Sequence, residues 1–436
     1  MMKQRRIGAA VAAVAALTLA VAGCSSETGG DAGNDGEPVE LEFMAWAPGI
    51  EKPIEVWNEQ NPNIQIKFTR MPNGEETSVK ISSSVAAGNA PCLAQLANTL
   101  TAGYVANGYL EDLSEYAADV ESQFLPWAWA EYSFGDAAYG IPQDTGPMML
   151  YYRTDVYDEL GLTAPTSWEE YAEQAATINA ANPEMYGAFV GTNDPGGFAS
   201  FSAQNGAEWT SVDGESWRVA VDSPQTIEVA EYWQGLLDDG IALAGPRYDP
   251  SFFKLLSDST LVNYVGAAWN AGLISSNVPD QAGNWAVAQM PTWADGATAN
   301  NGGSAVGVLA GCEHIPEAVE FATWLNTSEE SWNFMADPEE GGSLYPAAIE
   351  ALDYEIFDQP NEYFGGQVLG DAFAESASNV EGYWAWGPSA NETLTAFRDG
   401  LADVSQGRMT LPEVVEEAQA DTVDAMEERG LSVVTD

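Results

Sequence analysis

The chain has 436 residues, 45% of them apolar and 11% aromatic, which is enough apolar material for two or three folded domains. Its 66 acidic residues outnumber 14 basic ones and give a net charge of −52 at pH 7. So negative a chain repels phosphate and anionic lipid headgroups, which excludes nucleic-acid binding and docking on a membrane through a basic patch. The acidity either keeps the protein soluble at high salt or high pH, or attracts a cationic ligand, and the sequence leaves both readings open.

The start of the chain has the pattern of a secretory signal peptide. Three basic residues precede an apolar stretch over 7–22, which is short for a membrane span of about 20 residues. The box VAGC at 21–24 resembles the bacterial lipoprotein signal, in which the cysteine takes lipid and becomes the first mature residue. We therefore predict a signal peptide over 1–23, lipidation of Cys24 with palmitate, and a flexible polar tether over 24–37.

The next segments predict parallel α/β units. Apolar and acidic residues alternate over 39–46, apolar residues recur at helical spacing from Ile50 to Trp57, and alternation returns over 64–68. Such a strand–helix–strand crossover builds a parallel sheet. The elements predicted next are a helix over 75–87, a short buried strand over 92–96 and a helix over 99–110.

Later helices are predicted from their first residues. Two helices follow predicted capping boxes: a helix over 168–180 follows Thr166 and Glu169, and a helix that ends near 429 follows Thr410 and Glu413. Two others are predicted to begin at a proline, from Ser223-Pro224 to 239 and from Pro316 to 326. Residues 209–221, around Asp213-Gly214, predict a β-hairpin. Because strands and helices alternate along the chain, the predicted fold class is α/β.

Two cysteines remain beyond Cys24. Outside the cytoplasm, Cys92 and Cys312 favour a disulfide, while two buried free thiols and a metal site with His314 are the alternatives. Neither a C-x-x-C motif nor a second histidine supports the metal site. We therefore expect a disulfide, no bound metal and no cofactor.

One segment decides the interpretation. Residues 139–171 read YGIPQDTGPMMLYYRTDVYDELGLTAPTSWEEY, with a polar, bent crossing over 144–147 and a buried strand over 148–152. This segment resembles, without gaps, the signature of the family 1 extracellular solute-binding proteins, the maltose-binding-protein-like receptors of bacterial ABC importers. Further matches follow in the expected order, at 43–47, 94–110, 266–269, 289–291, 301–304 and 383–388. The resemblance covers about 39–429.

The resemblance implies a two-lobed periplasmic-binding-protein-like fold of type II, with hinged lobes and a ligand cleft between them. It places crossings near 143–148, 290–303 and 344–350. The lobes implied are lobe 1 over 38–145 and 303–345, and lobe 2 over 146–300 and 346–436. It also implies delivery of the ligand to the transmembrane subunits of an ABC permease. From the VAGC box we expect a lipid anchor on the outer face of the bacterial cell membrane, and we expect a monomer because binding and presentation require no symmetry.

The matched positions supply groups that suit a sugar, which has apolar faces and a hydroxyl edge. The expected binding residues are the platforms Trp46, Trp269, Trp384 and Trp386, the hydrogen-bonding residues Asn98, Asp144 and Thr145, and the backbone of Gly302 and Gly303. Each has a structural alternative: a tryptophan can belong to a core, an aspartate can cap a turn, and glycines can serve a hinge.

The sequence supports other classes of function less well. Aromatic and acidic groups together can also bind a cationic solute such as a polyamine or peptide, which is the main alternative to a mono- or oligosaccharide. A secreted glycoside hydrolase with paired carboxylates is a minor alternative, because 66 acidic residues make such pairs uninformative. With one histidine and no G-x-S-x-G, H-E-x-x-H or P-loop motif, we expect a binding protein and not an enzyme.

Overall fold

The computed structural model describes residues 38–293, 296–337, 344–380 and 386–435. The predicted signal peptide, the tether with Cys24, and Trp384 lie outside the described residues. Within the described ranges, no helix combines the length and the apolar character needed to cross a membrane.

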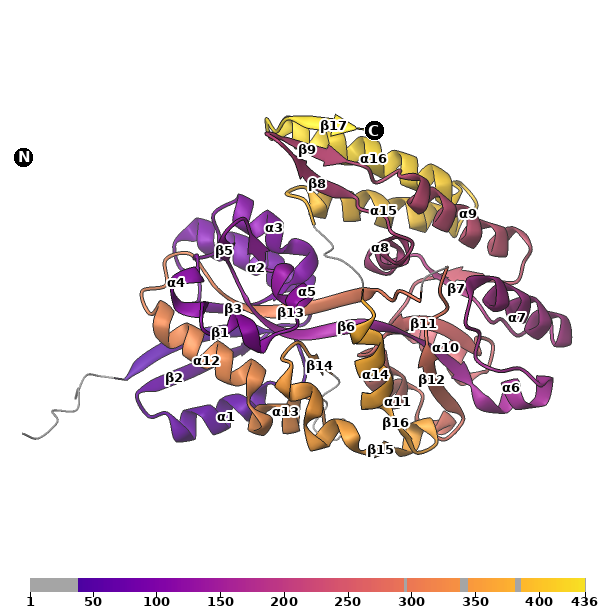
Figure 1. Ribbon diagram of the computed structural model, residues 1–436, viewed down its shortest axis with the longest axis horizontal. Helices are drawn as coiled ribbons and strands as arrows, with labels where there is room; N and C mark the ends of the chain where they lie inside the picture. The colour runs from indigo at the N-terminus through magenta and orange to yellow at the C-terminus, as the bar shows by residue number, and fades with distance from the viewer. Residues whose placement is uncertain (1–37, 294–295, 338–343, 381–385, 436) are drawn as a thin grey trace, which may run out of the picture. The chain divides into compact units, whose positions relative to one another are not determined.

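A mixed eight-stranded sheet organises the fold, in the order β11-β6-β13-β3-β1-β2, with β12 and β14 also paired to β6 (Figure 1). Its strands are β1 (Val39–Ala45), β2 (Ile64–Arg70), β3 (Leu93–Ala97), β6 (Ile141–Arg153), β11 (Asn263–Ala267), β12 (Trp285–Gln289), β13 (Asn300–Val308) and β14 (Tyr345–Pro346). As predicted from the first crossover, β1 is parallel to β2, and it is parallel to β3 as well. In contrast, β13 is antiparallel to both β3 and β6.

The long strand β6 crosses the expected boundary between the two lobes, at residues 145 and 146. Its first half pairs with β13 and β14, and its second half pairs with β11 on one edge and β12 on the other. The predicted bend over 144–147 is wrong, because Gly146 and Pro147 stay within a continuous strand that has partners along its length. The irregularity lies in β13 instead, whose register against β6 shifts between Asn300 and Gly303.

Helices cover the sheet in both lobes. Those within the expected lobe 1 are α1 (Glu51–Gln60), α2 (Gly74–Ala87), α3 (Asn98–Ala106), α4 (Ser114–Ala117), α5 (Pro126–Ala130), α12 (Ile315–Thr327) and α13 (Glu329–Met335). Those within the expected lobe 2 are α6 (Thr154–Leu160), α7 (Trp168–Ala181), α8 (Pro195–Gln204), α9 (Pro224–Asp238), α10 (Pro250–Ser257), α11 (Asn270–Asn277), α14 (Leu369–Ser378), α15 (Ala390–Val404) and α16 (Leu411–Glu428).

Small sheets complete the structure. They are β4 (Ser133–Phe134) with β5 (Ala137–Ala138), β7 (Phe189–Gly191) with β10 (Leu243–Gly245), β15 (Pro360–Asn361) with β16 (Gln367–Val368), and β17 (Val433–Thr435) with β9 (Ser216–Val219) and β8 (Thr210–Asp213). The antiparallel pair β8–β9 confirms the predicted hairpin.

The core of lobe 1 follows the strand alternation of β1. Leu41 and Phe43 face a core formed with α1, α12 and the end of β13, while Met44 faces a second cluster with Ile81 of α2. Only the second half of β1, from Phe43 to Ala45, is buried on both faces, since Glu40 and Glu42 in its first half are exposed. A disulfide joins Cys92, just before β3, to Cys312 after β13, with 4.9 Å between the Cα atoms, which confirms the predicted pairing.

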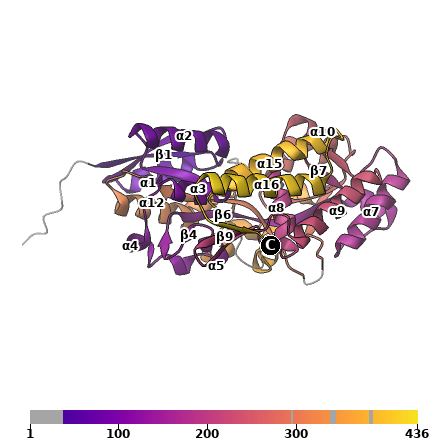
Figure 2. The ribbon, with the colours of Figure 1, turned by 90° about the horizontal axis from the view of Figure 1, so that it is seen from above.

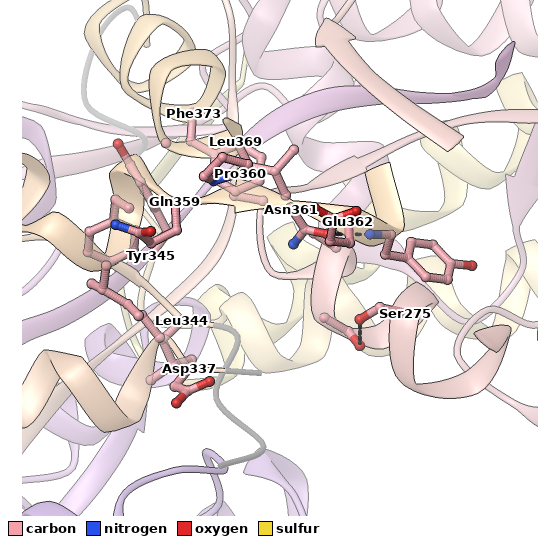
Figure 3. A pocket seen from close by; sticks show the side chains of 18 residues that line it. Ser275, Asp337, Leu344, Tyr345, Gln359, Pro360, Asn361, Glu362, Leu369 and Phe373 are labelled. Carbon is pink, nitrogen blue, oxygen red and sulfur yellow. Dashed lines mark hydrogen bonds between the residues drawn. The ribbon is translucent and has the colours of Figure 1, made fainter. Parts of the chain in front are cut away.

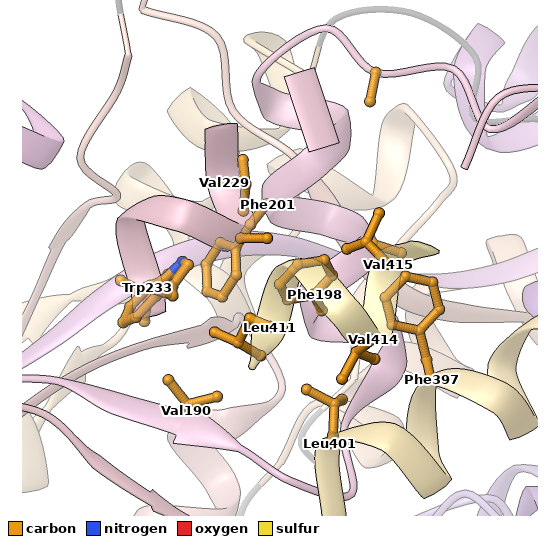
Figure 4. Packing of buried hydrophobic residues seen from close by; sticks show 14 of the residues in the cluster. Val190, Phe198, Phe201, Val229, Trp233, Phe397, Leu401, Leu411, Val414 and Val415 are labelled. Atoms are coloured by element: carbon orange, nitrogen blue, oxygen red, sulfur yellow. The ribbon is translucent and has the colours of Figure 1, made fainter. Parts of the chain in front are cut away.

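The core of lobe 2 lies on the two faces of the second half of β6. Met148 and Leu150 point into the larger cluster with α7, α8, α9, α15 and α16, and Met149 and Tyr151 point to the opposite cluster with α11 and α14. Figure 4 shows how side chains of α8, α15 and α16 converge in the larger cluster. There the Phe397 ring is stacked on Trp209, with 4.7 Å between ring centroids.

The helix caps agree with the sequence in one case and differ by one residue in another. Thr410 and Glu413 form the predicted capping box of α16. For α7 the prediction of Thr166 and Glu169 is wrong: the Ser167 side chain accepts from the Glu170 backbone N–H, and the Thr166 N–H donates to the Glu170 carboxylate at 2.8 Å. Thr166 and Ser167 can each cap a helix, with a glutamate three residues later, and the structure uses Ser167 and Glu170.

Candidate functional site

Helix α3 of the expected lobe 1 contacts α15 of the expected lobe 2, next to α16 (Figure 2). A small cavity lies between elements of both lobes and β13. It is lined by Asn98, Thr99 and Glu131 of lobe 1, by Asn300, Asn301 and Gly302 of β13, and by Gly196, Ala199, Ser200, Ala203 and Trp386 of lobe 2. Its volume of about 20 Å³ is far below the roughly 300 Å³ of an ordinary ligand pocket, so the lobes must separate to admit a ligand.

The polar residues of this cavity sit where regular elements begin, end or become irregular. Asn98 is the first residue of α3, directly after β3, and its side-chain oxygen accepts from the Thr99 N–H at 2.8 Å. Glu131 follows the last residue of α5. Gly302 has φ +86° within the irregular part of β13, a conformation that favours glycine.

Glu131 is the centre of a hydrogen-bond network. One of its carboxyl oxygens accepts from the Asn98 amide at 3.2 Å, and the other accepts from the Asn300 amide at 3.1 Å. The carbonyl oxygen of Gly302 accepts from the same two amides, at 3.0 and 2.8 Å. The side-chain oxygen of Asn300 accepts from the backbone N–H of Gly146 at 2.7 Å. These bonds fix the orientation of both amides.

The side chains of this region are polar, and burial keeps its two carboxyl groups only weakly charged. Loss of hydration raises the pKa of Glu131 to about 8, against the amide donors of Asn98 and Asn300, and the nearby Asp144 raises it further. Burial likewise raises the pKa of Asp144 to about 7, although the hydroxyl of Ser304 donates a hydrogen bond to its carboxylate. Near neutral pH, Glu131 is therefore largely protonated and Asp144 is partly so.

Trp269 forms a wall against β13. It directly precedes α11, and its indole N–H donates to the carbonyl oxygen of Asn301 at 3.0 Å. A Cβ atom added at Gly302 would lie 3.4 Å from the indole nitrogen, and one added at Gly146 would lie 2.1 Å from the Asn301 carbonyl oxygen. The close approach of β6, β13 and Trp269 therefore requires glycine at position 146.

The structure brings some of the predicted binding residues together. Asn98, Gly302 and Trp386 line the cavity, and Trp269 contacts the lining residue Asn301. Asp144 is buried nearby, where it raises the pKa of Glu131, and its carboxylate accepts from the Ser304 hydroxyl.

Other predicted residues face elsewhere. The Thr145 hydroxyl lies 3.4 Å from the carbonyl oxygen of Pro346, and a Cβ atom added at Gly303 would lie 2.9 Å from the Asp144 carbonyl oxygen. Trp46 packs beside Gly74 at the start of α2 and does not line the cavity. The position of Trp384 lies outside the described residues.

The sequence prediction missed Glu131, Asn300 and Asn301. The two asparagines directly precede the glycines that were singled out, so the run Asn-Asn-Gly-Gly over 300–303 carried a usable signal. The buried side-chain nitrogen of Asn301 has no hydrogen-bond partner among the residues that the structure describes. An unpaired buried donor next to a cavity is costly by itself and suits a ligand acceptor.

A larger hollow of about 520 Å³ lies elsewhere, lined by α11, α14 and residues 356–363 (Figure 3). It is rich in apolar and aromatic side chains, among them Phe357, Tyr363 and Phe373. None of the eight predicted binding residues in the described ranges lines it. The converging buried polar groups lie at the smaller cavity, which we therefore take as the candidate site.

Comparison with known proteins gives one family. Residues 45–331 match the model of the family described as bacterial extracellular solute-binding protein. The chain is 24% identical over 412 residues to the lactose-binding protein of Rhizobium radiobacter, covering 90% of this chain and 93% of that one. It is 23% identical over 330 residues to the arabinooligosaccharide-binding protein of Bacillus subtilis (strain 168), covering 72% and 74%.

A solved structure agrees over nearly the whole chain. The galacto-N-biose-/lacto-N-biose I-binding protein of the ABC transporter from Bifidobacterium longum, in complex with lacto-N-biose, superposes with a TM-score of 0.83 at 30% identity and covers 92% of this chain and 100% of that one. The fold is therefore the two-lobed α/β fold of periplasmic binding proteins, as predicted. The chain belongs to the bacterial extracellular solute-binding proteins, a family of receptors and not of enzymes.

Proposed function

We propose that this protein is the extracytoplasmic receptor of an ABC importer and binds a mono- or oligosaccharide between its lobes. The observation that carries the proposal is the set of uncharged hydrogen-bonding groups that converge beside an indole ring at the lobe junction. Amides of Asn98, Asn300 and Asn301, the Glu131 carboxyl and the Trp386 ring all line one cavity. Hydroxyl groups pair with the amides and carboxyl, and the ring suits the apolar face of a sugar.

The charge of the site favours a neutral ligand over a cation. Burial raises the pKa of Glu131 to about 8, so this carboxyl is mainly uncharged at pH 7. A polyamine would need a desolvated carboxylate as its partner, and among the described residues Glu131 is the one acidic side chain that lines the cavity. The names of the relatives agree, since two of them bind lactose and arabinooligosaccharides.

The proposed mechanism is closure of the lobes around the ligand. The proposed boundaries are lobe 1 over 38–145 and 303–345 and lobe 2 over 146–300 and 346–436, with the hinge in the crossing strands β6 and β13. The narrow cavity and the contact of α3 with α15 correspond to a closed arrangement. We propose that the closed, loaded receptor is a monomer that is held at the cell membrane by lipid on Cys24 and presents its ligand to the permease.

A thermal-shift panel tests the ligand class. We expect lactose, lacto-N-biose, galacto-N-biose or an arabinooligosaccharide to raise the Tm, because a ligand that binds only the native state adds about 2.7 kcal/mol to the unfolding free energy at a hundred times its Kd. Spermidine is the cationic comparison, and its binding would weaken steeply with added salt. A Tm raised by spermidine alone would contradict the proposal and support the cationic alternative.

Small-angle scattering tests the mechanism. With the saccharide that raises the Tm most, we expect the radius of gyration to fall as the lobes close. A radius that is the same with and without saturating saccharide would contradict closure. A variant without residues 1–37 serves in these solution measurements, because those residues precede β1.

A further inference from the structure

A buried arginine of lobe 2, Arg247, connects two walls of the candidate site without lining the cavity itself. It is 4% exposed, and its guanidinium is bonded on two sides: one nitrogen donates to the Asp194 carboxylate at 2.9 Å and another to the Val265 carbonyl oxygen at 2.7 Å. Burying a charge costs free energy, and replacing a buried ion pair by apolar residues often leaves the folded protein no less stable. The specific gain from arginine is the geometry that its planar fork imposes.

The first connection runs through Asp194 to α8. Asp194 caps this helix, since its other carboxylate oxygen accepts from the Gly197 N–H at 3.0 Å. Gly196 and Ser200 of the same helix line the cavity, and the Ser200 hydroxyl donates to the Asn300 carbonyl oxygen at 2.8 Å. The ion pair of Arg247 and Asp194 therefore fixes the first turns of α8 against the site.

The packing around this ion pair leaves little room for movement. A Cβ atom added at Gly191 would lie 2.4 Å from the Cδ atom of Arg247, and one added at Gly197 would lie 2.5 Å from an Asp194 carboxylate oxygen. The Asn193 side chain binds both backbone groups of Arg247, at 2.7 Å to the N–H and 3.1 Å to the carbonyl oxygen. The arginine is therefore held through both its side chain and its backbone.

The second connection runs through Tyr248 to Trp269. Tyr248 has φ +65°, a left-handed conformation that is uncommon for a large side chain and persists only when its surroundings impose it. Its ring lies 5.2 Å from the Arg247 guanidinium and 5.3 Å from the Trp269 ring. Because the Trp269 indole donates to Asn301, the position of Tyr248 bears directly on the site.

We propose that Arg247 is a positioning residue for ligand binding: it fixes α8 through Asp194 and Trp269 through Tyr248, and so sets two walls of the lobe 2 half of the cleft. This inference rests on the proposed function, since it concerns the same cavity. It goes beyond that function by making affinity depend on a side chain that does not touch the ligand.

The test compares Arg247→Lys with a matched control, Arg153→Lys. Arg153 is also 4% exposed and lies in lobe 2, where it pairs with Asp155 at 2.7 Å and lies over the Trp285 ring at 5.8 Å. None of these partners lines the cavity. We expect both variants to lower the Tm, and only Arg247→Lys to weaken binding of the best saccharide of the panel by about tenfold in titration calorimetry.

A second measurement needs no ligand. Arg247→Lys should change the near-ultraviolet circular dichroism of the aromatic side chains by releasing Tyr248 from Trp269, and this change should shrink in a Trp269→Phe background. The change caused by Arg153→Lys should be the same in both backgrounds, because Trp285 is its aromatic partner. If the wild-type protein binds no saccharide, the proposed function fails, and this measurement still decides whether Arg247 positions Trp269.

Two results would overturn the inference: equal loss of affinity in both arginine variants, or unchanged affinity in a folded Arg247→Lys protein. If Arg247→Lys does not fold, Tyr248→Leu removes the aromatic connection and leaves the ion pair in place. We expect it also to weaken binding by about tenfold, and unchanged affinity would again overturn the inference.

Discussion

The substitution Glu131→Gln tests the electrostatics of the site most directly. Burial raises the pKa of Glu131 from 4.5 to about 8, and Gln has nearly the same shape but cannot titrate. Between pH 4.5 and 8 the folded wild-type protein holds a proton that the unfolded chain has released. The stabilisation is complete below pH 4.5 and is lost as the pH rises to 8.

The expected magnitude follows from the difference between these two pKa values. Each pH unit in this window changes the wild-type unfolding free energy by about 1.4 kcal/mol through this one group. From pH 5 to pH 8 the sum is about 3.5 kcal/mol, because the folded protein is already half titrated at pH 8. Asp144 titrates in both proteins, so its contribution largely cancels when the variant is subtracted from the wild type.

The assay is urea unfolding, followed by far-ultraviolet circular dichroism at several pH values between 5 and 8. We expect the stability of the wild type relative to Glu131→Gln to fall by about 3.5 kcal/mol across this range. Glu169→Gln, on the exposed face of α7, is the control and should keep a constant difference from the wild type. A difference between wild type and Glu131→Gln that stays constant with pH would refute the reasoning.

Trp269→Leu should weaken saccharide binding by about 30-fold, or 2 kcal/mol, in titration calorimetry, because it removes a ring against β13; near-normal affinity would remove Trp269 from the site. Phe397→Ala should lower the unfolding free energy by about 3–5 kcal/mol in urea, since the ring is buried against Trp209, and a loss under 1 kcal/mol would contradict that packing. Cys92→Ala with Cys312→Ala should cost up to about 5 kcal/mol for a closed loop of 220 residues, and an unchanged Tm would show that the bond adds no stability.

Local patterns in the sequence predicted the local structure well. The alternation over 39–46 and 64–68 gives β1 and β2, and Thr410 with Glu413 gives the capping box, because each signal depends on residues a few positions apart. The predicted bend at 144–147 failed because strand partners distant in sequence keep Gly146 and Pro147 extended. Turn chemistry is a local preference that pairing on both sides of a strand can override.

The candidate site was predicted only in part, because only some of its residues stand in recognisable local motifs. Asn98, Gly302 and Trp386 were found by the family resemblance and line the cavity. Glu131 was not found, because it stands in no motif and is one of 66 acidic residues. Its importance comes from Asn300, which is 169 positions away and meets it only after the chain has folded.

Asn300 does two tasks at once: its amide nitrogen faces the cavity network through Glu131, while its amide oxygen ties β13 to β6 through the Gly146 N–H. With β6 and β13 as the proposed hinge, a replacement of Asn300 that changes the groups presented to a ligand also removes a hydrogen bond between these two strands. Ligand selectivity and the ease of lobe opening are therefore coupled at Asn300. Trp386 lies on neither β6 nor β13, so we expect a substitution there to change ligand preference with the least effect on the proposed hinge.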